Sequence, residues 1–138
     1  MRIGPGFSFS VWLLIVSITV VFIAPALSSG EEGRAVPNME SVEKGKELFQ
    51  SKGCVACHTI GGGKLSGPDL QGVTERREEE WLQKWIKSPD TMVMTDPIAR
   101  ELLKEYFVPM PNQGLTDEEV EEIIAYLKFK DSKKQQND

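Results

Sequence analysis

Apolar residues recur at intervals of three and four near the C-terminal end of the chain, and this pattern predicts a helix over residues 115–130. Thr116 and Glu119 have the spacing of a capping box, in which each side chain accepts a hydrogen bond from the other residue's backbone N–H at the start of a helix. Acidic residues crowd the N-terminal end, where the helix dipole favours negative charge. One face of this helix is apolar and consists of Val120, Ile123, Ile124 and Leu127.

A second segment with helical spacing lies at residues 41–52. Ser41 is a suitable N-cap, because its hydroxyl can accept a hydrogen bond from a free backbone N–H. Gly53 is typical of a helix end. We therefore predict a helix whose buried face is made of Val42, Gly45, Leu48 and Phe49.

Two shorter helices are predicted between these. Residues 78–88 carry apolar side chains on one side, and the helix ends at Pro89, which cannot continue it. Residues 96–107 begin with Asp96 as a cap and a proline at the first helical position.

The remaining segments are predicted to be loops. Residues 61–72, "GGGKLSGPDLQG", are rich in glycine, and the two prolines of residues 108–114, "VPMPNQG", disfavour a helix. No run alternates as a strand would. The sequence therefore predicts an all-α domain of about four helices at residues 41–130, with a linker at residues 29–40 and a disordered tail at residues 131–138.

The N-terminal segment has a different composition. Arg2 is the only charged residue before Glu31, and a long apolar stretch with small residues follows it. This is the layout of a secretory signal peptide over residues 1–28. Residues 7–27 are also about long enough to span a bilayer as an uncleaved membrane tether. Both alternatives place the remainder outside the cytoplasm, because the positive end of such a segment stays inside.

The net charge of the chain is −5, which argues against non-specific binding to nucleic acid. The charge is unevenly spread, since residues 41–64 contain four lysines against two glutamates, a balance of +2. This local excess is either a docking surface for an acidic partner or an ordinary solvated helix face.

Both cysteines of the chain and its single histidine lie within the five residues "CVACH", 54–58. A structural zinc site needs four ligands, and only three soft ligands are present. A redox-active cysteine pair favours a βαβ context that the helical pattern does not provide. A disulfide between the two cysteines would close a very small loop and leave His58 without a role.

Covalent attachment of haem uses all three residues. At the end of a helix, Cys54 and Cys57 lie about one turn apart on one face, so both sulfurs can form thioethers with the vinyl groups of one porphyrin. His58 follows directly and supplies an imidazole to the iron. The predicted cofactor is therefore one haem c with its iron. An export signal agrees with this prediction, because such haem is attached outside the cytoplasm.

The order of these motifs resembles that of bacterial class I c-type cytochromes, which carry a single haem. The resemblance rests on "GKELFQSKGCVACHTI", "GPDL", "WIKSP" and "VPMPNQGLTDEEVEEIIAYLK", and it covers residues 41–128. It implies the cytochrome c fold, in which helices and loops wrap round one haem and the first and last helices cross beside it. Gly45, Phe49 and Tyr126 stand at the positions that pack together in that crossing.

The resemblance also implies a hydrogen bond and a sixth ligand. The carbonyl of Pro68, in "GPDL", is expected to accept a hydrogen bond from the ring of His58. Because there is no second histidine, a methionine is the candidate sixth ligand, and Met92, Met94 and Met110 follow the attachment motif. The resemblance places the axial methionine at Met110, and we expect Met92 and Met94 to fill core space.

Trp81 and Trp85 lie at helical spacing, and most tryptophans in such a pattern are core residues. The resemblance adds a second interpretation, because these cytochromes often use an indole N–H near this position to hold a haem propionate. The sequence does not choose between the two side chains.

Ligation of the iron by His58 and Met110 would fill both axial positions and leave none for a substrate. We therefore expect a carrier of single electrons between extracytoplasmic or membrane-bound respiratory redox partners, without enzymatic activity of its own. The alternatives are a haem subunit of a larger reductase or oxidase, and a haem enzyme with a labile sixth ligand.

Overall fold

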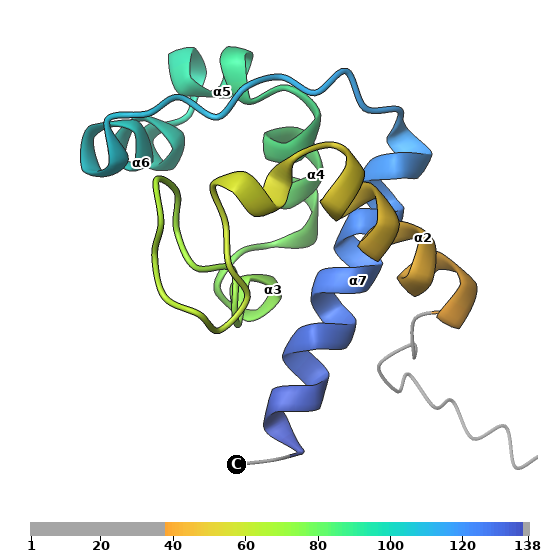
Figure 1. The fold of residues 1–138 in the computed structure, drawn as a ribbon. Coiled ribbons are helices and arrows are strands. Elements are labelled where there is room, and N and C mark those ends of the chain that lie inside the picture. Colours follow the sequence, from red (N-terminus) through yellow and green to blue (C-terminus); the bar gives the residue numbers. More distant parts are fainter. Residues whose placement is uncertain (1–37, 137–138) are drawn as a thin grey trace, which may run out of the picture. The chain divides into compact units, whose positions relative to one another are not determined.

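Two long helices that are far apart in sequence, α2 (Met39–Ser51) and α7 (Asp117–Gln135), cross and pack against each other (Figure 1). The computed structural model describes residues 38–136, and these residues contain helices, turns and loops without a strand. The predicted all-α class is therefore confirmed.

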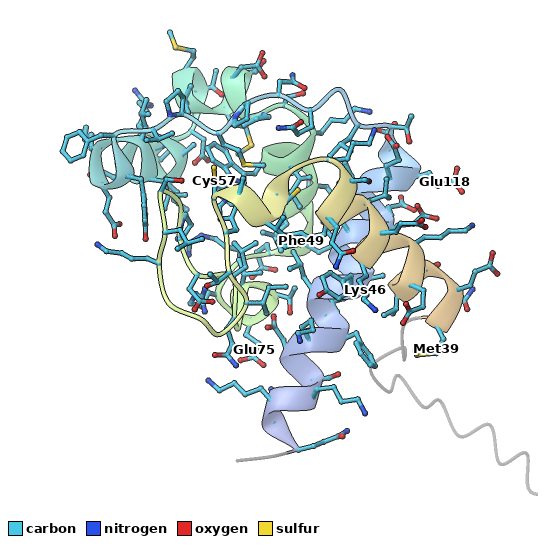
Figure 2. All side chains as sticks on the ribbon, in the orientation of Figure 1. Met39, Lys46, Phe49, Cys57, Glu75 and Glu118 are labelled. Atoms are coloured by element: carbon cyan, nitrogen blue, oxygen red, sulfur yellow. The ribbon has the colours of Figure 1, made fainter. Side chains whose placement is uncertain are left out.

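The crossing of α2 and α7 depends on Gly45. A Cβ atom at this position would lie 1.9 Å from the carbonyl oxygen of Glu122, so only glycine allows the two backbones to approach this closely. One turn further along α2, the ring of Phe49 lies 5.8 Å from the ring of Tyr126, at an interplanar angle of 52°. Figure 2 shows Phe49 on the side of α2 that faces α7. The predicted packing of Gly45, Phe49 and Tyr126 is confirmed.

Five short elements connect the two long helices and enclose the rest of the core (Figure 1). The core is built from apolar side chains of α2, α4 and α7, together with Leu115. In chain order the connecting elements are η1 (Cys54–Ala56), α3 (Val73–Arg76), α4 (Glu79–Lys87), α5 (Pro89–Thr95) and α6 (Pro97–Tyr106).

The structure contains two helices that the sequence pattern does not predict, α3 and α5. Pro89 is predicted only to end α4, but it also occupies the first position of α5, where its missing N–H costs nothing. The described residues therefore form six α-helices rather than about four.

The helix caps largely agree with the sequence. Asp96 accepts a hydrogen bond from the N–H of Ala99, and Thr116 and Glu119 form the predicted capping box. The N-cap of α2 is a correction, because Asn38 rather than Ser41 accepts the capping hydrogen bond. The predicted linker therefore ends before Asn38, and its earlier residues lie outside the described part of the chain.

The predicted disordered tail is also corrected. Helix α7 continues to Gln135, and Asp131 is only 4% exposed. Its carboxylate accepts hydrogen bonds from the backbone N–H of Gly72 at 2.6 Å, from that of Thr74 at 3.1 Å and from the Thr74 hydroxyl at 2.7 Å. A buried carboxylate that accepts three hydrogen bonds caps α3 from a distant part of the chain.

The predicted signal peptide or membrane tether, residues 1–28, lies outside the described residues. Among the helices within residues 38–136, none has the length and apolar character needed to cross a bilayer.

Asp131 gives a test of this corrected C-terminus. Asp131→Ala leaves three partly buried donors without an acceptor, so we expect it to lower the free energy of unfolding by about 2 kcal/mol. Urea unfolding of the haem-loaded protein, followed by circular dichroism, measures this loss. The matched control is Lys134→Ala, an exposed position on the same helix, where we expect a change within about 0.5 kcal/mol. A disordered tail would instead make both variants equal to the wild type.

Candidate functional site

All five side chains that the sequence assigns to the site line one cavity. Cys54, Cys57 and His58 reach it from the end of α2 and the turn that follows, Pro68 from the next loop, and Met110 from the segment between α6 and α7. Figure 2 shows Cys57 on the ribbon just beyond α2. The fold therefore brings three separate segments together round one space.

The rest of the cavity wall is mainly apolar. Side chains from each of the helices α2 to α7 contribute to it, so the space is shielded on several sides. Among them are Phe49, Leu82, Ile86, Val93, Leu103 and Leu127. Such a lining suits a large apolar group rather than a polar substrate.

The attachment motif forms a tight turn. Gly53 has φ 79°, in the left-handed region, and it ends α2 and starts η1. The backbone N–H groups of Cys57 and His58 both donate to the carbonyl oxygen of Cys54, at 3.1 and 3.0 Å. One turn therefore separates the two cysteines, as predicted. Both thiols are free and half-buried, and burial raises the pKa of Cys54.

The His58 ring is held by the loop that follows. Its Nδ1 lies 2.9 Å from the carbonyl oxygen of Pro68, the contact that the sequence predicts. Because a carbonyl oxygen can only accept, Nδ1 carries the proton and the lone pair of Nε2 remains for a metal. Gly67 makes the approach possible, since a Cβ there would lie 2.7 Å from Cε1 of His58. Sequence reasoning missed Gly67, although it directly precedes Pro68 in "GPDL".

The carboxylate of Asp69 organises this glycine-rich loop. Its Oδ1 accepts hydrogen bonds from the backbone N–H groups of Gly61 and Gln71, both at 2.8 Å, and its Oδ2 accepts one from Gly63 at 2.6 Å. These three hydrogen bonds lower the pKa of Asp69 to about 2, and the bond from Gly61 makes the largest contribution. Asp69, which directly follows Pro68 in the chain, is thus anchored through both oxygens of its carboxylate.

Met110 is the methionine that the fold brings to the cavity. Of the four methionines within residues 38–136, it alone lines this space. Met92 is 8% exposed and fills the core, as expected. Met94 is 76% exposed, so the expectation that it fills core space is wrong. The unpredicted helix α5 explains the difference, because residues two positions apart on a helix do not share a face.

The two tryptophans are distinguished by their surroundings. Both line the cavity, and their rings are stacked with centroids 5.6 Å apart. Nε1 of Trp81 is buried, and it makes no hydrogen bond of acceptable geometry within residues 38–136. Its N–H adds only weakly to the lowering of the Asp96 pKa, which comes mainly from the N–H of Ala99. A buried indole N–H rarely lacks a partner, so Trp81 rather than Trp85 is suited to meet a polar group of the cofactor.

Two arginines that the sequence analysis did not single out also line the cavity. The guanidinium of Arg76 donates to the carbonyl oxygens of Gln71 and Asp69, and that of Arg77 lies 5.5 Å from the centre of the Trp81 ring. Neither forms an ion pair within residues 38–136. Unpaired positive charge at an otherwise apolar cavity suits a ligand with acidic groups at one edge.

Comparison with known proteins identifies the family. A sequence model of the cytochrome c family matches residues 42–129. The chain belongs to the cytochrome c family. A solved structure of cytochrome c from Rhodothermus marinus superposes with a TM-score of 0.67 and 27% identity, covering 70% of this chain and 82% of that one. The fold and the resemblance to class I mono-haem cytochromes are thereby confirmed.

Subunits of a reductase and of an oxidase are also similar to this cytochrome. One of the subunits of nitric oxide reductase from Stutzerimonas stutzeri is 29% identical over 65% of this chain and 58% of that protein. Cytochrome c oxidase subunit 2 of Alkalihalophilus pseudofirmus is 27% identical over 67% of this chain and 26% of that protein. The chain thus spans about three fifths of one relative and about a quarter of the other.

Family and fold establish covalently bound haem c, with its iron, as the cofactor of this electron-transfer protein. The residues at the cavity fit such a group. Two thiols lie one turn apart, an imidazole keeps Nε2 free, and the surrounding wall is apolar. The buried indole N–H of Trp81 and the two arginines suit the propionates of a haem.

The predicted excess of positive charge near the motif is largely neutralised. Lys44 lies 3.6 Å from Glu122, and Lys52 lies 2.9 Å from Glu119. Both glutamates belong to α7, so a balance counted over residues 41–64 alone omits them. These two lysines are not free charges that could attract an acidic partner.

The lowered pKa of Asp69 predicts that the stability of the fold depends on pH. Its pKa is lowered from an ordinary 3.8 to about 2 in the folded protein, so folding favours the charged form. The stability that this charge contributes is fully present above about pH 4 and is lost as the pH falls through about 2. We expect Asp69→Asn to lower the free energy of unfolding at about pH 5, and its difference from the wild type to shrink toward about pH 2.5. Urea unfolding at both pH values provides the measurement.

The control for this experiment is Glu121→Gln. Glu121 is exposed on α7, and its carboxylate accepts no hydrogen bond from residues 38–136. The free energy of unfolding of Glu121→Gln should remain close to that of the wild type at both pH values. If the free energy of unfolding of Asp69→Asn differed from that of the wild type by the same amount at both pH values, the role of the carboxylate charge would be contradicted.

Proposed function

We propose that this cytochrome carries single electrons between respiratory redox partners on the outer side of the cytoplasmic membrane and has no enzymatic activity of its own. The observation that carries the proposal is the convergence of Cys54, Cys57, His58 and Met110 on one apolar cavity. This set would supply two covalent attachments and two ligands to the iron, which would leave no coordination position for a substrate.

Each residue has a separate role in this proposal. Cys54 and Cys57 would hold the porphyrin through thioethers, His58 would bind the iron through Nε2, and Met110 would bind it through its sulfur. The haem, when bound, supplies reversible one-electron oxidation and reduction of its iron. The remaining work of the protein is to hold these ligands in place and to exclude water.

The surroundings of the ligands tune the reduction potential. The carbonyl of Pro68 fixes the His58 ring and strengthens it as a ligand by accepting a hydrogen bond from Nδ1. A methionine as second axial ligand raises the potential relative to histidine alone. Trp81, Arg76 and Arg77 would meet the propionates, and their donors would stabilise the negative charge there.

The proposed location and partners rest on the N-terminal sequence and on the relatives. Residues 1–28 have the layout of a signal peptide, or of a tether through residues 7–27, and either would place the haem domain outside the cytoplasm. The similar proteins named above include subunits of a nitric oxide reductase and of a cytochrome c oxidase. Redox proteins of respiratory chains are therefore the proposed donor and acceptor.

Replacement of Met110 tests the ligation. In the ferric haem-loaded protein, Met110→Ala should abolish the weak sulfur-to-iron absorption band in the red region. Cyanide affinity should rise by roughly tenfold or more, because an iron–sulfur bond no longer opposes binding and each 1.4 kcal/mol is a factor of ten. The control is Met94→Ala, an exposed position outside the cavity, which should leave both properties unchanged. A wild type that lacks the band and binds cyanide as readily as Met110→Ala would favour a haem enzyme with a labile sixth ligand.

A second candidate function is that of a haem subunit within a larger reductase or oxidase. It is favoured by the similarity to subunits of such complexes, of which this chain spans only a part. Native gel electrophoresis of mild detergent extracts from the host separates the two functions. A free carrier should run as a small haem-staining band, whereas a subunit should run with a complex many times larger.

A further inference from the structure

The segment that carries Met110 has little secondary structure to hold it. Between the end of α6 and the start of α7, residues 108–114 form neither a helix nor a strand. Figure 1 shows this segment running past α5 on its way to α7. Its backbone makes no hydrogen bond to the backbone of another element within residues 38–136. Some other contact must therefore keep it in place.

In this segment, the amide nitrogen and the amide oxygen of the Asn112 side chain each make a hydrogen bond. Asn112 Nδ2 donates to Asp90 Oδ1 at 2.9 Å, and Asn112 Oδ1 accepts the backbone N–H of Gly114 at 2.9 Å. Gly114 has φ 64°, which glycine adopts without strain and which turns the chain back toward α7. The first bond reaches another element, and the second shapes the turn next to it.

Asp90 belongs to a firmly seated part of the fold. It lies in the first turn of α5, directly after Pro89, which is less than 2% exposed. Met92, in the same helix, is 8% exposed within the core. Helix α5 is thus a fixed support, and Asp90 presents a carboxylate from it to a segment that has no backbone hydrogen bonds to another element.

We propose that Asp90 and Asn112 form a latch that positions Met110 as an iron ligand and limits its replacement by an external ligand. The proposal rests on the function proposed above, in which Met110 is the sixth ligand. Only Pro111 separates Met110 from Asn112, and its ring fixes its own φ and restricts the backbone of Met110. A displacement at Asn112 is therefore passed directly to Met110.

The apolar side chains of this segment lie at the cofactor's space. Val108, Pro109, Met110 and Pro111 all line the cavity. Without the latch, the segment would depend mainly on its contacts with the cofactor. The hydrogen bond to Asp90 therefore acts on the equilibrium between the ligated and the released methionine, and both residues are positioning residues.

The test measures cyanide binding to the ferric, haem-loaded protein by stopped-flow absorption, together with the red-region sulfur-to-iron band. Asp90→Ala removes the acceptor and should speed cyanide binding by roughly three- to tenfold. Asn112→Asp should speed it further, because two carboxylates then face each other.

Exchange of the two groups provides the decisive variant. In the double variant Asp90→Asn with Asn112→Asp, the new amide at position 90 can donate to the new carboxylate at position 112. That carboxylate can still accept the N–H of Gly114. The rate should return to within about twofold of the wild type, a rescue that a general loss of packing would not give.

The matched control is Thr91→Ala, next to Asp90 on the exposed side of α5, where the side chain makes no hydrogen bond with residues 38–136. It should bind cyanide at the wild-type rate. The latch is overturned if the wild type shows the band but Asp90→Ala and Asn112→Asp leave the rate unchanged, or if the exchange fails to restore it. A wild type without the band would overturn the proposed ligation and the latch together.

Discussion

The close contact between the backbones of α2 and α7 determines where the other parts of the molecule can lie. It depends on the absence of a side chain at Gly45, and it fixes the direction in which α2 ends. The two cysteines and His58 follow within seven residues of that end, so their position relative to α7 is set by the crossing. Helices α3 to α6 then complete the cavity around a framework that is already oriented.

Different forces hold the core and the loops of this protein. The core is apolar and is built on α2, α4 and α7. The loop that supports His58 instead depends on polar contacts, since Asp69 binds three backbone N–H groups and Asp131 caps the short helix that follows. A glycine-rich loop has little apolar surface to bury, so hydrogen bonds to fixed carboxylates take over that role.

The sequence predicted the features that depend on local pattern, and it missed those that depend on distant partners. The stripe of α7, the capping box at Thr116 and the attachment turn are each set by residues a few positions apart, and all were found. Helix α3 has no apolar pattern of its own and is capped by Asp131 from α7, which no local pattern reveals. The neutralisation of Lys52 has the same cause, because its acidic partner Glu119 also belongs to α7.

The pairing of the first and last described helices has a consequence for the order in which the protein matures. A chain made from its N-terminus presents Cys54, Cys57 and His58 long before α7 exists. The pocket walls contributed by α7 cannot assemble until α7 itself has been made, since contacts between such distant segments form late. During that interval α7 does not yet cover the two sulfurs, so haem can reach them before the pocket closes.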